Sequence, residues 1–92
     1  MFFMNEFHAI GVMSGTSLDG VDIAYCSFKN SSNWSFKILK SESFKYNENW
    51  IQKLKTANEL SGINLLKLHN SYGQFLGEII NSFIVKNNID KI

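Results

Sequence analysis

Residues 10–22 read IGVMSGTSLDGVD, in which two apolar runs flank a polar segment that contains glycine. The first run, His8 to Met13, predicts a short buried strand that ends where a serine and a glycine follow. The second run, Val21 to Phe28, alternates with a period of two and predicts a second strand. Because Asp-Gly between two strand patterns is a strong hairpin signal, Asp19 and Gly20 predict that these strands are adjacent and antiparallel.

After the second strand, the hydrophobic period changes from that of a strand to that of a helix. Trp34 to Phe44 alternates once more, so three sequential strands predict an antiparallel meander. Asn47 is placed to cap a first helix, and Ser61 with Gly62 interrupts it before a longer second helix. An α/β fold is therefore expected, with both helices on one face of the sheet. The apolar stripe of the second helix is formed by Leu65, Leu68, Tyr72, Phe75, Leu76, Ile79, Ile80, Phe83 and Ile84.

Composition and charge exclude several classes of protein. The 92 residues allow one small domain or part of a larger one, and a hydrophobic share of 45% is typical of a globular core. The net charge of +1, without a basic stripe, argues against binding to nucleic acid or to an anionic membrane. No stretch approaches the roughly 20 apolar residues that span a bilayer, and no basic region precedes the apolar start. We therefore expect a cytoplasmic protein.

Several single residues predict structural roles. Cys26 has no second cysteine with which to pair and lies in a strand pattern, so we expect a buried thiol. His8 and His69 have no His, Cys or carboxylate at metal-ligand spacing, which favours structural roles for both. Gly73 and Gly77, four residues apart on the long helix, predict close packing against a neighbouring element.

The segment between the first two strands is the part of the chain that carries chemistry. Its glycines would let backbone N–H groups approach a phosphate, and its Ser and Thr hydroxyls would add donors. A carboxylate beside a phosphate requires an intervening Mg²⁺, for which either Asp19 or Asp22 is a candidate ligand. The segment matches neither GxxxxGK[ST] nor GxGxxG. An ordinary Ser/Thr-rich turn therefore remains an alternative.

The run from Ile10 to Asp22 resembles the opening signature of the anhydro-N-acetylmuramic acid kinases, I/L-G-x-M-S-G-T-S-x-D-G-x-D. The match has no gap and lies near the amino terminus, as in that family. Residues 72–76, YGQFL, are similar to the family's L/Y-G-x-x-F/L helix pattern. The resemblance implies an actin/hexokinase-like (ribonuclease H-like) fold, two lobes with ATP in the cleft. Residues 1–92 are then expected to be the N-terminal part of the first kinase lobe.

The resemblance also implies an activity. Members of the family use ATP and water to open the 1,6-anhydro ring of anhydro-N-acetylmuramic acid and to phosphorylate O6. The product is N-acetylmuramic acid 6-phosphate, in the recycling of peptidoglycan. The implied partners are ATP with Mg²⁺, the anhydro-amino-sugar substrate and, for the full-length enzyme, a second copy in a homodimer. The positions that match the family's nucleotide-phosphate loop are expected to bind ATP: Gly15, Thr16, Ser17, Leu18, Asp19, Gly20, Val21 and Asp22.

The family's catalytic base has no counterpart in this sequence. The family pattern continues with His-Gly-Gln-Thr and later with Asp-Thr-Gly-Pro-Gly-Asn, whose Asp activates water, and the sequence reaches Ile92 before either. We therefore expect no catalytic residue among the 92 and no activity from this chain alone. The alternative is a stand-alone α/β binding or structural module that keeps the hairpin without catalysis. Ile89 and Ile92 favour a truncated kinase lobe, because they are typical of the start of a further strand.

Overall fold

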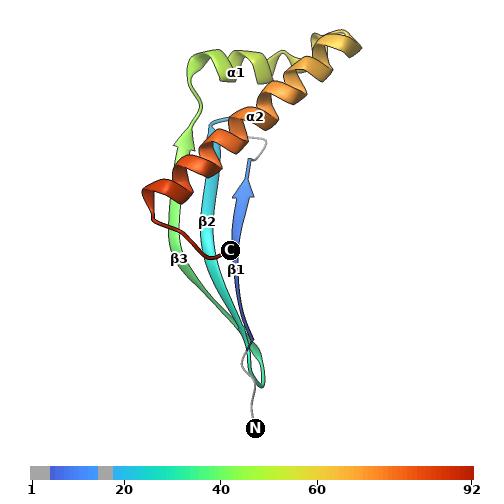
Figure 1. The fold of residues 1–92 in the computed structure, drawn as a ribbon. Coiled ribbons are helices and arrows are strands. Elements are labelled where there is room, and N and C mark those ends of the chain that lie inside the picture. Colours follow the sequence, from blue (N-terminus) through green and yellow to red (C-terminus); the bar gives the residue numbers. More distant parts are fainter. Residues whose placement is uncertain (1–4, 15–17) are drawn as a thin grey trace.

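The computed structural model of the protein describes residues 5–14 and 18–92. The described part contains three strands in the order β1-β2-β3, with both neighbouring pairs antiparallel, and two α-helices after them (Figure 1). The predicted meander followed by two helices is confirmed. The elements are β1 Asn5–Met13, β2 Gly20–Asn30, β3 Trp34–Lys45, α1 Glu48–Lys55, the 3₁₀ turn η1 Ala57–Glu59 and α2 Gly62–Lys86.

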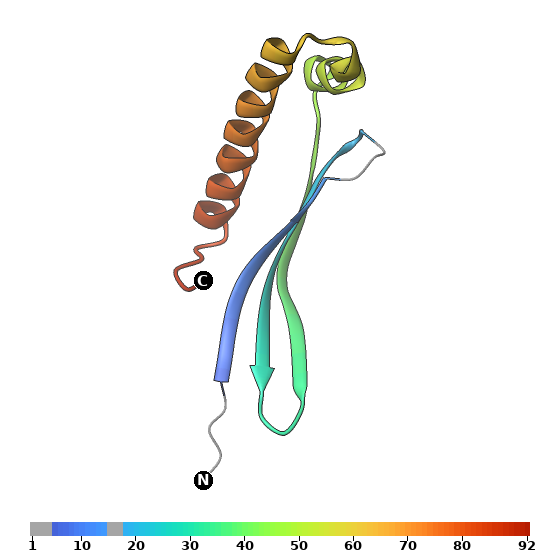
Figure 2. The ribbon, with the colours of Figure 1, turned by 90° about the vertical axis from the view of Figure 1, so that its right-hand side faces the viewer.

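One face of the sheet is covered by α2, and α1 lies beyond the end of the sheet (Figure 2). Burial of the inward side chains of β2 and α2 drives this arrangement. The predicted burial is confirmed side chain by side chain, because each of these residues is part of the core or packs against it: Trp50, Leu54, Tyr72, Phe75, Leu76, Ile79 and Phe83. The expectation that both helices lie on one face of the sheet is wrong for α1, which lies beyond the end of the sheet (Figure 2). Leu65, in the first turns of α2, is 45% exposed, and Leu68 and Ile84 of the predicted stripe are only partly buried. The core consists of Val21, Ile23, Tyr46, Ile79 and Phe83.

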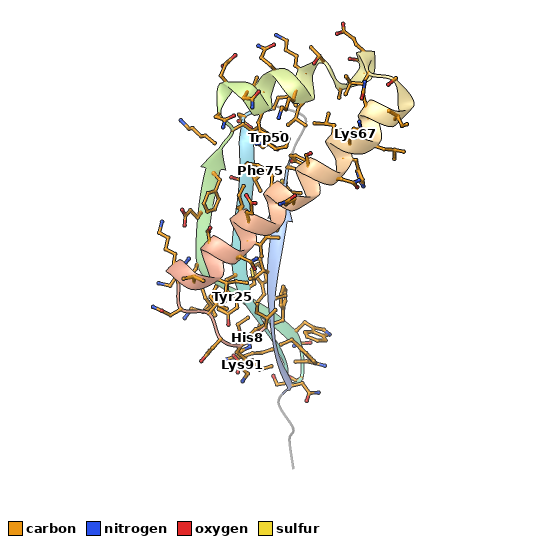
Figure 3. The ribbon with its side chains drawn as sticks, turned by 45° about the horizontal axis from the view of Figure 1, so that its top comes forward. His8, Tyr25, Trp50, Lys67, Phe75 and Lys91 are labelled. Atoms are coloured by element: carbon orange, nitrogen blue, oxygen red, sulfur yellow. The ribbon has the colours of Figure 1, made fainter. Side chains whose placement is uncertain are left out.

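Side-chain caps decide where both helices begin. The Trp50 N–H donates to Oδ1 of Asn47 over 2.9 Å, which confirms the predicted cap of α1. The Asn64 N–H donates to the hydroxyl of Ser61 over 3.3 Å, so Ser61 does more than interrupt the first helix: it caps α2. The two helices then contact through aromatic rings, with the Trp50 and Phe75 centroids 4.8 Å apart (Figure 3).

A β-bulge divides β3 into two halves. Even-numbered side chains face away from α2 before the bulge and toward α2 after it. Tyr25 pairs with Lys40, but Cys26 pairs with Ile38, so Leu39 is the extra residue. A single extra residue moves every later side chain to the other face of the strand. Phe44 therefore packs against the core, on the side of α2. The prediction of one unbroken alternation from Trp34 to Phe44 is wrong for this reason.

The face of the sheet away from α2 is here called the open face. It carries a group of exposed apolar side chains at one end. The rings of Phe7 and Trp34 lie 6.0 Å apart, and those of Phe28 and Phe36 lie 6.3 Å apart. All four rings are exposed, as is Ile38 beside them. The bulge places the β3 members of this group on the open face, at the end of the sheet remote from the β1–β2 loop.

Two smaller expectations are wrong in the described part of the chain. A Cβ added to Gly73 or Gly77 would meet no atom within 4 Å, so neither glycine is explained by close packing here. Cys26 is partly exposed on the open face and is not a fully buried thiol. Among the described residues, none of the helices has the length and apolar character required to cross a membrane.

Candidate functional site

The candidate site is the β1–β2 loop, residues 14–19, with the first residues of β2. The predicted antiparallel adjacency of the first two strands is confirmed by the pairing of Met13 with Asp22. Three of the eight predicted ATP-binding residues, Gly15, Thr16 and Ser17, lie outside the described residues. The structure places the other five at the base of the loop, where β2 begins: Leu18, Asp19, Gly20, Val21 and Asp22.

Asp19, the last residue of the loop, and Gly20, which follows it, are held against the end of β3. The Tyr46 N–H donates to the carbonyl oxygen of Asp19 over 3.0 Å. Gly20 lies so close to β3 that a Cβ at this position would be 2.2 Å from the carbonyl oxygen of Phe44. Leu18 has a φ of 59°, a left-handed conformation that non-glycine residues seldom adopt. Glycine at position 20 is therefore required by close approach of the backbone.

The five described positions do not present equivalent groups to a ligand. Val21 is 1% exposed and belongs to the core, so only its backbone is available at the site. Asp19 and Asp22 are both exposed and lie on either side of Gly20. Asp22 also has a fixed partner, because the Ser43 hydroxyl donates to its Oδ1 over 2.5 Å. Val21 therefore has a structural role, whereas the carboxylates of Asp19 and Asp22 are exposed beside the loop.

A small hollow of about 150 Å³ lies between the loop base and the end of β3. Asp19 at the end of the loop and Asp22 in β2 line it on one side, and Ser43 and Lys45 of β3 line it on the other. Lys45 pairs with Gly20 across the two strands. A lysine, missing from the loop itself, is therefore supplied by β3. No pattern in the sequence indicates Ser43 or Lys45, because only the β2–β3 register brings them to the loop.

The donor set limits how a magnesium ion would be bound. Within residues 5–14 and 18–92, no group of three or more His, Cys, Asp or Glu side chains is arranged to hold a metal ion. Mg²⁺ in nucleotide sites is commonly held by one or two carboxylates together with phosphate oxygens and water. The exposed carboxylates of Asp19 and Asp22 fit that mode, in which the nucleotide itself brings the remaining oxygens.

Near the end of β3, two tyrosines form a partly buried polar contact. The hydroxyls of Tyr46 and Tyr72 are hydrogen-bonded to each other between β3 and α2. Burial, and next the hydrogen bond with Tyr72, raises the pKa of Tyr46 well above its usual range. Tyr46 stays neutral at physiological pH and joins α2 to the strand end that holds Asp19.

A second cluster of polar side chains lies at the other end of the sheet, near the C-terminal residues. Oε1 of Glu6 accepts a hydrogen bond of 2.9 Å from Ser27 and lies 3.4 Å from Nε2 of His8. His8 stacks on Tyr25, whose hydroxyl donates to the carbonyl oxygen of Lys91 over 2.7 Å (Figure 3). His8 therefore has a carboxylate neighbour that its sequence spacing did not indicate, and its contacts are structural.

Comparison with known proteins decides the family. The family profile described as "Anhydro-N-acetylmuramic acid kinase" matches residues 7–91. The chain belongs to the anhydro-N-acetylmuramic acid kinase family. The resemblance predicted from residues 10–22 is confirmed, and the actin/hexokinase-like assignment fits this family.

Individual relatives agree with the family match. The kinase of Francisella tularensis subsp. novicida is 29% identical over 92 residues, which cover 95% of this chain and 24% of the relative. The kinase of Haemophilus influenzae is 32% identical over 90 residues, which cover 95% of this chain and 22% of the relative. The kinase of Pseudoalteromonas translucida is 34% identical over 76 residues, which cover 78% of this chain and 19% of the relative. The chain thus spans about a quarter or less of these relatives.

Proposed function

We propose that this chain is the N-terminal part of the first lobe of an ATP-dependent anhydro-N-acetylmuramic acid kinase, and that the β1–β2 loop binds the phosphates of ATP. The family match and the geometry of the loop support the proposal. The observation that carries it is the close approach of Gly20 to Phe44, which holds a signature loop with two exposed carboxylates at the end of a sheet.

The described residues have distinct roles in this proposal. Backbone N–H groups and hydroxyls of the loop donate to phosphate oxygens, since hydrogen bonds to charged oxygens are stronger than those between neutral groups. Asp19 or Asp22 faces the Mg²⁺ that accompanies the nucleotide. Lys45 adds a positive charge at the β3 side of the same hollow. These groups bind and orient the nucleotide; none of them activates water.

The reaction we propose for the complete kinase polypeptide is opening of the 1,6-anhydro ring of anhydro-N-acetylmuramic acid by water with transfer of the ATP γ-phosphoryl group to O6. The products are N-acetylmuramic acid 6-phosphate and ADP. The general base and the remaining nucleotide contacts come from parts of the polypeptide outside these 92 residues. A cytoplasmic location and a homodimer of the complete enzyme belong to the same proposal.

The test is a kinase assay of the complete polypeptide with Mg²⁺–ATP and the anhydro-sugar, with the phosphorylated sugar identified by mass spectrometry. Asp19→Ala is expected to lower turnover by about 10²–10³, the usual effect of losing a positioned electrostatic group. Asp90→Ala, at an exposed position near Ile92, is the matched control. Full activity of Asp19→Ala would show that the loop is only a turn, and absence of product from the unsubstituted protein would contradict the proposed reaction.

A further inference from the structure

Asp22 and Ser43 are direct cross-strand neighbours on the open face of the sheet. The Ser43 hydroxyl donates to Oδ1 of Asp22, and the two oxygens are 2.5 Å apart. This distance belongs to the short, charge-assisted class of hydrogen bonds between a hydroxyl and a carboxylate, for which about 2.5–2.7 Å is usual. Both residues are exposed, so burial does not restrain the Asp22 side chain. The hydrogen bond from Ser43 restrains it instead.

We propose that Ser43 is a positioning residue, which orients the Asp22 carboxylate toward Mg²⁺–ATP bound at the β1–β2 loop. This inference rests on the proposed function. An exposed aspartate loses rotational freedom when it binds a ligand, and a partner that restrains it beforehand lowers that entropic cost. Ser43 is suited to the task because it extends from a strand whose backbone is paired to β2 at this position.

The geometry leaves Asp22 able to act on a cation. The hydrogen bond from Ser43 engages Oδ1, so Oδ2 is the oxygen that can turn toward a metal ion or its water. A hydroxyl donor adds no positive charge, so the carboxylate keeps the charge that a divalent cation requires. Both side chains line the hollow of about 150 Å³ that Asp19 and Lys45 also border. The contact thus lies beside the loop.

Ser41 supplies a matched control, because it lies two residues before Ser43 on the same face of β3 and pairs with Ala24, which has no carboxylate. The experiment measures ATP binding to the complete polypeptide by titration calorimetry, once with Mg²⁺ and once with EDTA. Ser43→Ala is expected to weaken binding with Mg²⁺ by roughly three- to tenfold, as for loss of one hydrogen bond to a charged group in an exposed position. In EDTA, Ser43→Ala is expected to bind ATP as tightly as the unsubstituted protein does. Ser41→Ala is expected to bind ATP as tightly as the unsubstituted protein in both conditions.

A second pair of variants isolates the hydroxyl from the shape of the side chain. Ser43→Thr keeps the donor and Ser43→Val replaces it with a methyl group, so the first is expected to bind Mg²⁺–ATP normally and the second to resemble Ser43→Ala. In an Asp22→Asn background, Ser43→Ala is expected to cause no further loss, because Ser43 acts through Asp22. Thermal unfolding of each variant verifies that the fold is intact.

Three results would overturn the inference alone: normal binding of Mg²⁺–ATP by Ser43→Ala, an equal loss in EDTA, or an additional loss in the Asp22→Asn background. A different result would overturn the proposed function together with the inference. That result is an unsubstituted protein whose ATP binding does not depend on Mg²⁺. The two failures are therefore distinguishable in one set of titrations.

Discussion

A Cβ on Gly20 would lie 2.2 Å from the carbonyl oxygen of Phe44, so the first residue of β2 touches the backbone of β3. No side-chain rearrangement relieves this contact, because both atoms belong to or adjoin the main chain. The β1–β2 loop consequently ends at a position that only glycine can occupy. This relationship links the loop, through β3, to Tyr46 and the core.

Gly20→Ala is expected to destabilise the fold by about 1–3 kcal/mol, since the strands must separate to admit the methyl group. Gly11→Ala is the control, because a Cβ at Gly11 would meet no atom within 4 Å. Its effect is expected to stay within about 0.5 kcal/mol. Urea unfolding followed by tryptophan fluorescence measures both. Equal stability of the two variants would contradict the close approach.

Phe83→Ala is expected to cost about 3–5 kcal/mol of unfolding free energy, the usual result of removing a fully buried aromatic ring. Phe83 is 0% exposed in the core between α2 and the sheet. Val85, two residues later on the same helix, is 76% exposed, so Val85→Ala is expected to be nearly neutral. Both values come from urea unfolding curves. A small loss in Phe83→Ala would mean that α2 does not pack on β2 as described.

Asn47→Ala is expected to lower stability by about 1 kcal/mol, because the N–H of Trp50 loses its side-chain acceptor at the start of α1. Asn49→Ala removes a similar side chain from an exposed position inside the first turn of the same helix and serves as the control. Asn47→Asp is expected to retain the cap. Thermal unfolding measures the differences, and an unchanged melting temperature in Asn47→Ala would contradict the cap.

The Glu6–Ser27 contact predicts a dependence of stability on acid pH. The hydrogen bond from Ser27 is the main cause that holds the pKa of Glu6 below its usual value of 4.5. A carboxyl group whose pKa is lower in the folded state contributes stability at pH values above its unfolded pKa, and loses it as pH falls through the folded pKa. We therefore expect this contribution to be complete above about pH 5 and to fade below pH 4.5.

Ser27→Ala tests the contact directly, because it removes the donor that lies 2.9 Å from Oε1 of Glu6. The pKa of Glu6, read from its side-chain carboxyl carbon by NMR, is expected to rise toward the usual value. Ser41→Ala, on the other face of the sheet, is expected to leave it unchanged. A Glu6 pKa that does not respond to Ser27→Ala would contradict the assigned cause.

The 92-residue chain by itself is expected to show no kinase activity and at most weak affinity for ATP. Phosphoryl transfer depends on positioning and on stabilisation of charge from several sides, and one loop holds the nucleotide at one end only. The assay is incubation with Mg²⁺–ATP and anhydro-N-acetylmuramic acid, with the complete polypeptide as the positive control. Production of N-acetylmuramic acid 6-phosphate by the purified short chain would contradict this expectation.

The amino-acid sequence alone determined the order and type of the elements and the location of the candidate loop. The alternation in β2 and the spacing of three and four residues in α2 are local signals, because residues close together in the sequence are enough to define them. The cap at Asn47 is equally local. The family signature in residues 10–22 also needed no tertiary information, since its residues are contiguous.

The tertiary structure alone decided which side chains share a face and meet at the site. The bulge at Leu39 reverses the alternation of β3, and it places Trp34 and Phe36 on the open face while Phe44 packs against the core. The β2–β3 register then brings Ser43 to Asp22, although the two are 21 residues apart in sequence. Pairing over such separations depends on the packing of all three strands and α2, which no local pattern in the sequence encodes.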